Sequence, residues 1–309
     1  MYKNILPEKI SRLIGESNDH LISKIMKNLN YDNLKVRDLS FKELSNLVEE
    51  AFLKIENAKR DPSGPSKLEK WNNGWAENLK LLKDGIDPSQ ALKPGYYRPG
   101  NIIRFGKKWV YSEDTDIEYK LFEIIRSYLF EKFLKEYESI YEFGCGSVHN
   151  LYNWSNIDPS KEYYGFDWAD PVLEIGKTLS NTSNINTFKY DLFNPSPINK
   201  KFEINSKSCA ITIGAMEQMG SNFEKFIKVL FDSKFDLVIH VEPIVEFLDD
   251  IILTDFVAKL FMTNRNYLNG LKTYLENLKD ENKIQLISSQ KVELCGMMNL
   301  GWNILVWKN

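Results

Sequence analysis

The segment from Ile140 to Asn150, IYEFGCGSVHN, constrains the fold of this chain more than any other part. Its start is typical of a buried strand, and the glycines that follow indicate a tight turn that opens a helix. Gly144 and Gly146 can take backbone angles that a Cβ forbids, so a ligand can approach the main chain closely. The first N–H groups of the following helix favour polar or anionic ligand atoms. The segment predicts a nucleotide-like ligand at the end of a parallel strand.

Further apolar runs follow, and each ends in or near a polar residue: 163–167, 185–191, 209–213 and 235–241. Helical stretches lie between them, so strands and helices alternate as a doubly wound parallel sheet requires. Asp167 lies about 20 residues beyond the glycines, the offset at which an acidic side chain accepts hydrogen bonds from ribose hydroxyls. Ligands of such sheets bind outside the carboxyl ends of the strands, where we expect Gly144, Asp167, Asp191, Glu217 and His240 to gather.

These motifs, in this order, resemble those of class I S-adenosylmethionine-dependent methyltransferases, over roughly residues 118–309. The resemblance implies an α/β fold with a Rossmann-like seven-stranded methyltransferase sheet and S-adenosyl-L-methionine as the cofactor. It places Asp167 at the ribose hydroxyls and Asp191 with Leu192 at the adenine, while Glu142 and the two glycines border the methionine part. The cofactor-binding residues that we predict are Arg104, Glu142, Gly144, Cys145, Gly146, Asp167, Trp168, Asp191, Leu192 and Ala215.

The glycine turn departs from two known patterns. The methyltransferases commonly have a third glycine where this chain has Val148, so either the turn after Gly146 is shaped differently or the cofactor tolerates a side chain there. This departure keeps open a cofactor-binding regulatory protein without catalysis. A nicotinamide dehydrogenase is the competing Rossmann interpretation, but it expects G-x-G-x-x-G, and position 149 is His.

Composition agrees with a soluble enzyme. The 309 residues are 43% hydrophobic, which suffices for an α/β domain of about 190 residues and a smaller one of about 115. The net charge of −3 provides no field that would draw the protein to nucleic acid or to an anionic membrane. Three cysteines and three histidines form no metal-ligand pattern, so we expect no metal. We expect a cytoplasmic protein with a small-molecule substrate, and a homodimer stays open.

The region 1–117 has a different organisation from the methyltransferase domain predicted over 118–309. Apolar residues at helical spacing predict helices over 8–30 and 40–58, the second opened by a capping box. We expect a helical lid region without a second sheet, followed by a long helix over about 116–137.

Aromatic loops with glycine and proline suit a lid that closes over the cofactor. Arg104 is the candidate partner of the carboxylate of the cofactor's methionine end. Trp75, Tyr96 and Tyr97 either line the substrate pocket or pack the helices onto the sheet.

Methyl transfer is an in-line displacement, so the protein must hold a nucleophile about 3 Å from the methyl carbon and must deprotonate a hydroxyl acceptor. His240 is the predicted general base because it titrates near neutrality at the end of a strand, although a structural histidine is equally compatible with the pattern. Glu242 would orient His240 or bind substrate. Glu217 either faces the pocket or serves as the favourable charge of a helix N-terminus.

A long segment, 244–280, replaces the one helix of a minimal methyltransferase and predicts a helical cap insertion after the fifth strand. Arg265, Asn266 and Tyr267 are expected within its helix and at the acceptor. Residues 283–288 and 302–307 predict a final antiparallel hairpin. The substrate-binding residues that we predict are Trp75, Tyr97, Gln218, Glu246, Arg265, Asn266 and Tyr267.

Glu-Gln at 217–218, His-x-Glu-Pro at 240–243 and Arg-Asn-Tyr at 265–267 together resemble a bacterial small-molecule subgroup of these methyltransferases. We therefore expect methyl transfer to a hydroxyl of a small polar metabolite, such as a sugar or nucleotide sugar. The alternative is N-methylation of an amine or of a peptide or protein side chain, with Glu217, Glu242 and Glu246 binding the cationic acceptor.

Overall fold

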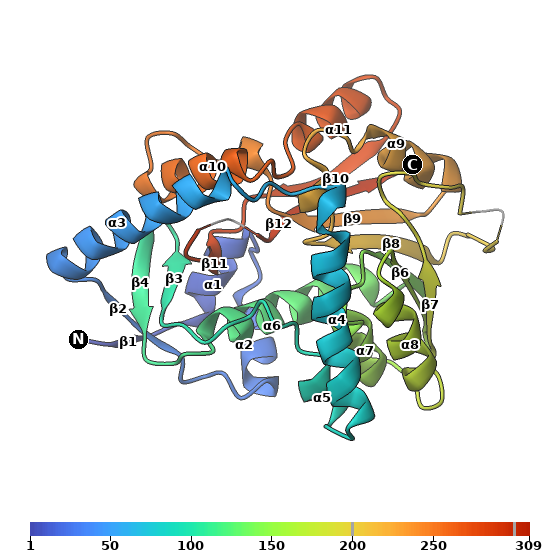
Figure 1. Cartoon of the computed structure of the whole chain (residues 1–309), viewed down its shortest axis with the longest axis horizontal. Coiled ribbons are helices and arrows are strands. Elements are labelled where there is room, and N and C mark those ends of the chain that lie inside the picture. Colours follow the sequence, from blue (N-terminus) through green and yellow to red (C-terminus); the bar gives the residue numbers. More distant parts are fainter. Residues whose placement is uncertain (199–200, 299–300) are drawn as a thin grey trace.

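The computed structural model describes residues 1–198, 201–298 and 301–309. Two sheets lie side by side in Figure 1, and the larger has the strand order β10-β12-β9-β8-β5-β6-β7. Its strands are β5 (Ser139–Phe143), β6 (Glu162–Asp167), β7 (Ile185–Lys189), β8 (Ser208–Ile213), β9 (Leu237–Glu242), β10 (Gln285–Gln290) and β12 (Asn303–Lys308). Strands β5 to β9 run parallel, whereas β12 is antiparallel to both β9 and β10. The predicted seven-stranded sheet and its final antiparallel pair are confirmed.

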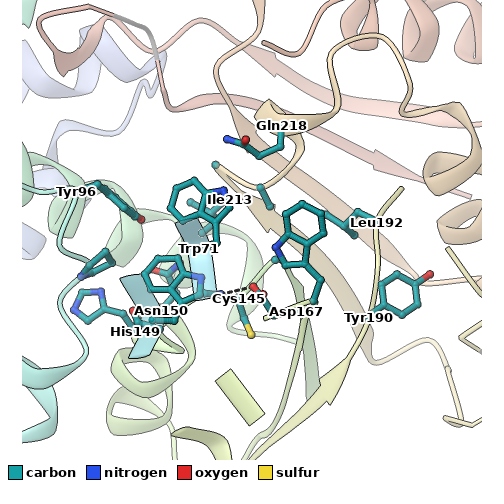
Figure 2. A pocket seen from close by; sticks show the side chains of 18 of the residues that line it. Trp71, Tyr96, Cys145, His149, Asn150, Asp167, Tyr190, Leu192, Ile213 and Gln218 are labelled. Carbon is teal, nitrogen blue, oxygen red and sulfur yellow. Dashed lines mark hydrogen bonds between the residues drawn. The ribbon is translucent and has the colours of Figure 1, made fainter. Parts of the chain in front are cut away.

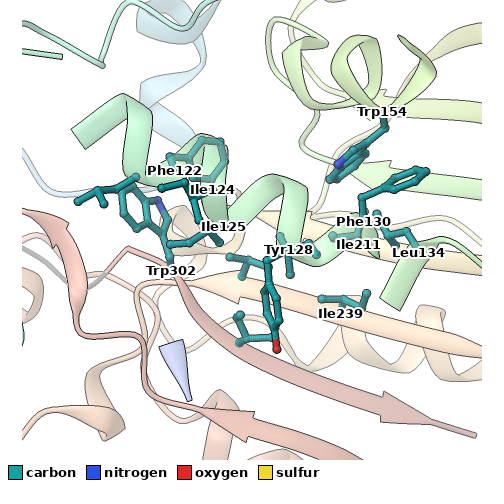
Figure 3. Close-up of a cluster of buried hydrophobic side chains, with 14 of the residues drawn as sticks. Phe122, Ile124, Ile125, Tyr128, Phe130, Leu134, Trp154, Ile211, Ile239 and Trp302 are labelled. Carbon is teal, nitrogen blue, oxygen red and sulfur yellow. The ribbon is translucent and has the colours of Figure 1, made fainter. Parts of the chain in front are cut away.

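Helices cover both faces of this sheet, as its strands require, because a parallel strand with apolar side chains on both faces must be shielded on both. One face packs against α6 (Ile117–Leu129), which continues as a π-helical turn over Phe130–Leu134, and against α7 (His149–Ile157) and α8 (Asp170–Leu179). Figure 3 shows the α6 side of this core above Ile211 and Ile239. The other face packs against α9 (Glu224–Ser233) and α11 (Leu271–Asp280).

The amino-terminal region is not purely helical, so the prediction of no second sheet is wrong. Its helices are α1 (Pro7–Ile14), α2 (Asp19–Asn28), α3 (Phe41–Ala58), α4 (Leu68–Lys83) and α5 (Pro88–Ala91), with a 3-10 turn at Pro65–Lys67. The capping box of α3 is confirmed. The five-stranded sheet consists of β1 (Lys3–Asn4), β2 (Lys35–Asp38), β3 (Ile102–Phe105), β4 (Lys108–Ser112) and β11 (Leu294–Gly296).

Two physical reasons explain why the sequence hid this second sheet. Its longest strand, β4, has five residues, too few for a clear alternation of apolar and polar side chains. One edge strand, β11, comes from the far end of the chain and pairs antiparallel with β3. The segment 294–296 thus crosses the predicted domain boundary and ties the two sheets together.

The long segment after β9 is helical, as predicted, but its first helix lies on the amino-terminal region and not over the seven-stranded sheet. After a 3-10 turn at Val245–Phe247, α10 (Leu253–Asn264) packs on α3, with Val257 against Leu47, Ala51 and Ile55. Only α11 lies on the seven-stranded sheet. The insertion therefore braces the amino-terminal region. Within the described ranges, we find no helix with the length and apolar character that crossing a membrane requires.

Candidate functional site

The glycine turn joins β5 to α7 through three residues with positive φ. Gly144 has φ 75°, Gly146 has φ 53° and Val148 has φ 66°. A left-handed backbone costs a β-branched residue on the order of 1–3 kcal/mol, so the surrounding structure must hold Val148 in place. The Val148 side chain is fully buried in the core. Val148 thus adopts the left-handed angles that favour glycine and keeps its side chain away from the ligand side of the turn.

Asp167, the last residue of β6, connects this turn to the neighbouring strand. Its two carboxylate oxygens accept hydrogen bonds from the backbone N–H groups of Gly146 and Ala169, both at 2.9 Å. Burial outweighs these bonds and raises the pKa of Asp167 to about 6. The carboxylate therefore lies at the carboxyl end of the sheet, where ligands of doubly wound folds bind.

A cavity opens over these strand ends and contains about 840 Å³ of space free of protein atoms, part of it continuous with solvent (Figure 2). Several predicted residues line it: Trp75, Tyr96, Gly144, Cys145, Gly146, Asp167, Trp168, Leu192, Ala215 and Gln218. Lining residues that sequence reasoning missed include Trp71, Phe122, His149, Asn150, Phe193 and Met219. Trp71 precedes Trp75 by four residues, so it shares a helix face with it, and that spacing could have revealed it.

Aromatic rings from α4 and the following loop cover the cavity. The rings of Trp71 and Trp75 are stacked with centroids 5.5 Å apart, and Tyr96 meets Trp75 edge-on at 6.3 Å. A Cβ placed on Gly146 would lie only 2.7 Å from an indole carbon of Trp75. The indole therefore rests directly on the glycine turn, and a larger residue at position 146 would displace it.

Glu242 and Glu217 shape the turn that follows β8. The Glu242 carboxylate accepts hydrogen bonds from the N–H groups of Ala215 at 3.1 Å and Glu217 at 3.2 Å. Burial raises the pKa of Glu242 to about 8 and that of Glu217 to about 7. Gln218 Nε2 donates to Glu217 Oε1 at 2.8 Å. Glu242 thus positions the backbone, and Glu217 contacts the cavity lining through Gln218.

Glu142 lies buried beneath the glycine turn. Asn150 Nδ2 donates to its Oε1 at 2.7 Å, whereas Oε2 has no hydrogen-bond partner among the described residues. Burial raises the pKa of Glu142 to about 8. The second oxygen is an acceptor without a donor close to the cavity.

His240 does not occupy the position that a general base needs, which corrects the prediction. It is fully buried within β9, and Trp307 Nε1 donates to its Nε2 at 3.2 Å. Its Nδ1 lies 3.0 Å from the Thr212 hydroxyl. Burial lowers the pKa of His240 to about 3, so the ring is neutral near pH 7. Both ring nitrogens are engaged inside the sheet, so His240 is the structural histidine that the strand pattern also allowed.

Arg104 also lies away from the cavity, contrary to its predicted role at the cofactor. Its side chain, 1% exposed, extends from β3 and forms a buried ion pair with Asp255 of α10. Lys291 also pairs with Asp255, at 2.6 Å. Arg104 therefore fastens α10 to the smaller sheet.

The predicted polar cluster of the insertion is not in mid-helix, because α10 ends at Asn264. Arg265 pairs with Asp61 at 2.8 Å, Asn266 has φ 55° beside Gly220, and Tyr267 packs edge-on against Phe261.

Three more predicted residues have structural contacts outside the cavity lining. Tyr97 stacks on Phe122, the Glu246 carboxylate accepts from the Lys272 N–H, and the Asp191 carboxylate accepts from the Phe193 N–H. None of the three is among the lining residues, and their ligand contacts stay predictions.

Comparison with known proteins gives only distant structural matches. No family model and no curated protein match the chain. Among solved structures, an O-methyltransferase family 2 protein from Planctomyces limnophilus with apigenin matches at 8% identity and TM-score 0.40, over 58% of this chain and 52% of that one. Human N-acetylserotonin methyltransferase with SAM matches at 12% identity and TM-score 0.39, over 63% of this chain and 55% of that one.

The N,N-8-amino-8-demethyl-D-riboflavin dimethyltransferase of Streptomyces davawensis matches at 10% identity and TM-score 0.42, over 76% of this chain and 68% of that one. The chain spans about half the length of the first two of these structures. The chain's own motifs and sheet order resemble those of class I methyltransferases. These motifs, the sheet order and the geometry of the site are the basis of the proposed function.

Proposed function

We propose that this protein is an S-adenosylmethionine-dependent methyltransferase that acts on a small polar molecule. The observation that carries the proposal is the hydrogen bond from the Gly146 N–H to Asp167, at the mouth of a cavity over the carboxyl ends of β5, β6 and β8. It joins a glycine turn suited to close backbone approach with a carboxylate suited to ribose hydroxyls.

The residues present fit this cofactor. A Cβ on Gly144 would collide with the Ala215 Cβ at 2.3 Å, so the glycine allows the turns after β5 and β8 to approach closely and form one continuous surface beneath the cavity. The unpartnered Oε2 of Glu142 suits an ammonium group. The rings of Trp168 and Phe193, stacked at 5.5 Å, offer apolar surface to a base beside Leu192.

When bound, the cofactor supplies an electrophilic methyl group on a sulfonium. The protein must orient the acceptor and receive its proton. Glu217 is our candidate for the proton acceptor because burial raises its pKa to about 7, near the working pH. The choice of a sugar-type hydroxyl depended on His240, and the buried position of that ring removes its support.

Calorimetry with S-adenosylhomocysteine tests the cofactor assignment, and turnover tests catalysis. We expect saturable binding by the wild type and strongly weakened binding by Asp167→Ala, with circular dichroism verifying that the variant is folded. Wild-type protein that is folded but binds neither S-adenosylmethionine nor its product would contradict the proposal. Binding without product formation across a broad acceptor panel would favour the non-catalytic alternative.

A further inference from the structure

The side chain of Gln218 presents a free acceptor to the cavity (Figure 2). Gln218 is only 7% exposed, and its Oε1 is buried without a hydrogen-bond partner among the described residues. Its Nε2 donates to the Glu217 carboxylate at 2.8 Å, which fixes the amide orientation and keeps the oxygen on the other side. A buried acceptor without a donor is costly, so this oxygen is suited to a ligand that donates.

The carboxyl groups around the cavity favour a cation, because a bound positive charge stabilises their ionised forms against the burial that raises their pKa values. Glu142, Glu217 and Glu242 all lie beneath or beside it, and none of the described residues that line it is Lys or Arg. His149 is also in the lining, but burial and the neighbouring Arg126 hold its pKa well below the usual range, so the ring is neutral. Arg265 and Lys67 are not among the lining residues, and both pair with Asp61. The positive charges of Arg265 and Lys70 act on Glu217 and that of Arg126 acts on Glu142, but among the described residues none of these cations forms an ion pair with either carboxyl group.

Aromatic faces complete this environment. Trp71, Trp75 and Tyr96 line the same cavity, and their rings are in contact with one another. The negative face of an aromatic ring attracts a cation, and its flat surface packs against a carbon skeleton.

We infer that the methyl acceptor is a small primary amine whose ammonium group donates to Gln218 Oε1 beside Glu217, with its carbon skeleton against Trp71 and Trp75. This inference rests on the proposed function. An ammonium brings three donors and a positive charge to a site of acceptors and carboxyl groups, whereas a hydroxyl brings one donor and no charge.

The transfer balances in atoms and electrons. Glu217 takes one ammonium proton, and the freed nitrogen lone pair forms the new bond to the methyl carbon. The electron pair of the broken carbon–sulfur bond stays on sulfur, so the products are a methylated ammonium and S-adenosylhomocysteine. Glu217 then releases its proton to solvent.

The test compares two ligands with the same carbon skeleton, phenethylamine and 2-phenylethanol, on the full chain saturated with S-adenosylhomocysteine. We expect calorimetry to show at least tenfold tighter binding of the amine. Gln218→Leu should weaken amine binding about tenfold and leave alcohol binding nearly unchanged. Gln218→Glu, which adds a carboxylate, should tighten amine binding. Glu49→Gln, at an exposed position of α3, is the control and should change neither.

Binding of S-adenosylhomocysteine alone is measured first, so that two failures can be told apart. If the product binds but the alcohol equals or exceeds the amine, or the amine does not bind at about millimolar concentration, the amine inference is overturned and the cofactor assignment stands. Weaker amine binding by Gln218→Glu than by wild type would also overturn the inference. If S-adenosylhomocysteine itself does not bind, the proposed function fails, and the inference fails with it.

Discussion

The floor and the roof of the cavity are built by different forces. The floor consists of the turns 144–148, 167–169 and 214–218, and carboxylates hold it through backbone N–H groups: Asp167 holds Gly146, and Glu242 holds Ala215 and Glu217. The roof consists of Trp71, Trp75 and Tyr96, which contact one another through their rings. Hydrogen bonds to charged groups are directional, whereas ring contacts tolerate sliding.

This difference divides the work of the site. A floor with fixed N–H and carboxylate positions suits a ligand that is the same in every turnover, which is the cofactor. A roof of packed rings on a helix can shift to admit an acceptor and close behind it. Substitutions in the floor should therefore weaken cofactor binding, and substitutions in the roof should weaken acceptor binding.

The largest effect is expected from Gly144→Ala in the floor. The new Cβ would lie 2.3 Å from the Ala215 Cβ, at a φ of 75° that disfavours any side chain. We expect a loss of roughly 2–4 kcal/mol in the free energy of unfolding and at least a hundredfold rise in the Kd for S-adenosylhomocysteine. Denaturant unfolding and calorimetry measure the two quantities.

Gly85→Ala is the matched control, since Gly85 has φ 81° and nothing within 4 Å of an added Cβ. It should cost about 1 kcal/mol from backbone strain and leave cofactor binding unchanged. Equal effects of the two variants would mean that strain, not the collision in the floor, is responsible.

The second effect concerns the pH dependence of stability, through Glu142 beneath the floor. Its pKa is about 8 in the folded protein against 4.5 ordinarily, so between these values the folded state binds more protons than the unfolded state. Stability from this group is fully present below pH 4.5 and is lost as the pH rises through 8. Glu142→Gln removes this loss.

Glu142→Gln should therefore match the wild type at about pH 4 and be more stable by on the order of 2–3 kcal/mol at about pH 9, measured by denaturant unfolding without cofactor. The control Glu49→Gln, on the surface of α3, should keep the wild-type pH profile. A parallel profile for Glu142→Gln would show that folding does not raise the pKa of Glu142.

The third effect concerns cofactor binding by Asp167 and Asp191, which the sequence predicted to bind the cofactor alike. Asp167→Asn replaces a carboxylate that accepts from two backbone N–H groups and faces the cavity. We expect the Kd for S-adenosylhomocysteine to rise about thirtyfold, or about 2 kcal/mol, since hydrogen bonds to a charged acceptor are lost. Asp191→Asn should change it less than threefold, because Asp191 caps its own turn. A larger effect at Asp191 would show that the cofactor reaches further along β7 than the floor suggests.

These aspartates illustrate what the sequence could predict. Apolar runs separated by helical stretches identified the parallel strands, because each buried strand has its own short run of apolar residues in the sequence. The same runs predicted that Asp167 and Gly146 meet, since parallel strands align their carboxyl ends. The sequence pattern did not predict which side chains at the end of a strand reach the site. His240 and Glu242 lie on the same face of β9, but His240 interacts with Thr212 and Trp307 inside the sheet. Only Glu242 reaches the turn after β8.

The smaller sheet and the roof required contacts that are distant in sequence. β11 pairs with β3 across more than half of the chain, and Arg104 forms its ion pair with Asp255 on a helix that the sequence assigned to a cap. No local pattern specifies such partners. Trp75 was a candidate for the pocket because of its aromatic surroundings, but only the fold shows that its ring rests on Gly146.

The smallest effect is expected in the roof, from Tyr96→Ala. Tyr96 is 55% exposed, so its loss should change the free energy of unfolding by no more than about 1 kcal/mol. We expect phenethylamine to bind three- to tenfold more weakly to the complex with S-adenosylhomocysteine, since one aromatic face is lost, whereas the Kd of the product itself should stay within twofold. Phe41→Ala, which removes an 87% exposed ring from α3, controls for the loss of an aromatic side chain as such. If Tyr96→Ala weakened product binding as much as amine binding, the roof would belong to the cofactor site, and the division between a fixed floor and an adaptable roof would not hold.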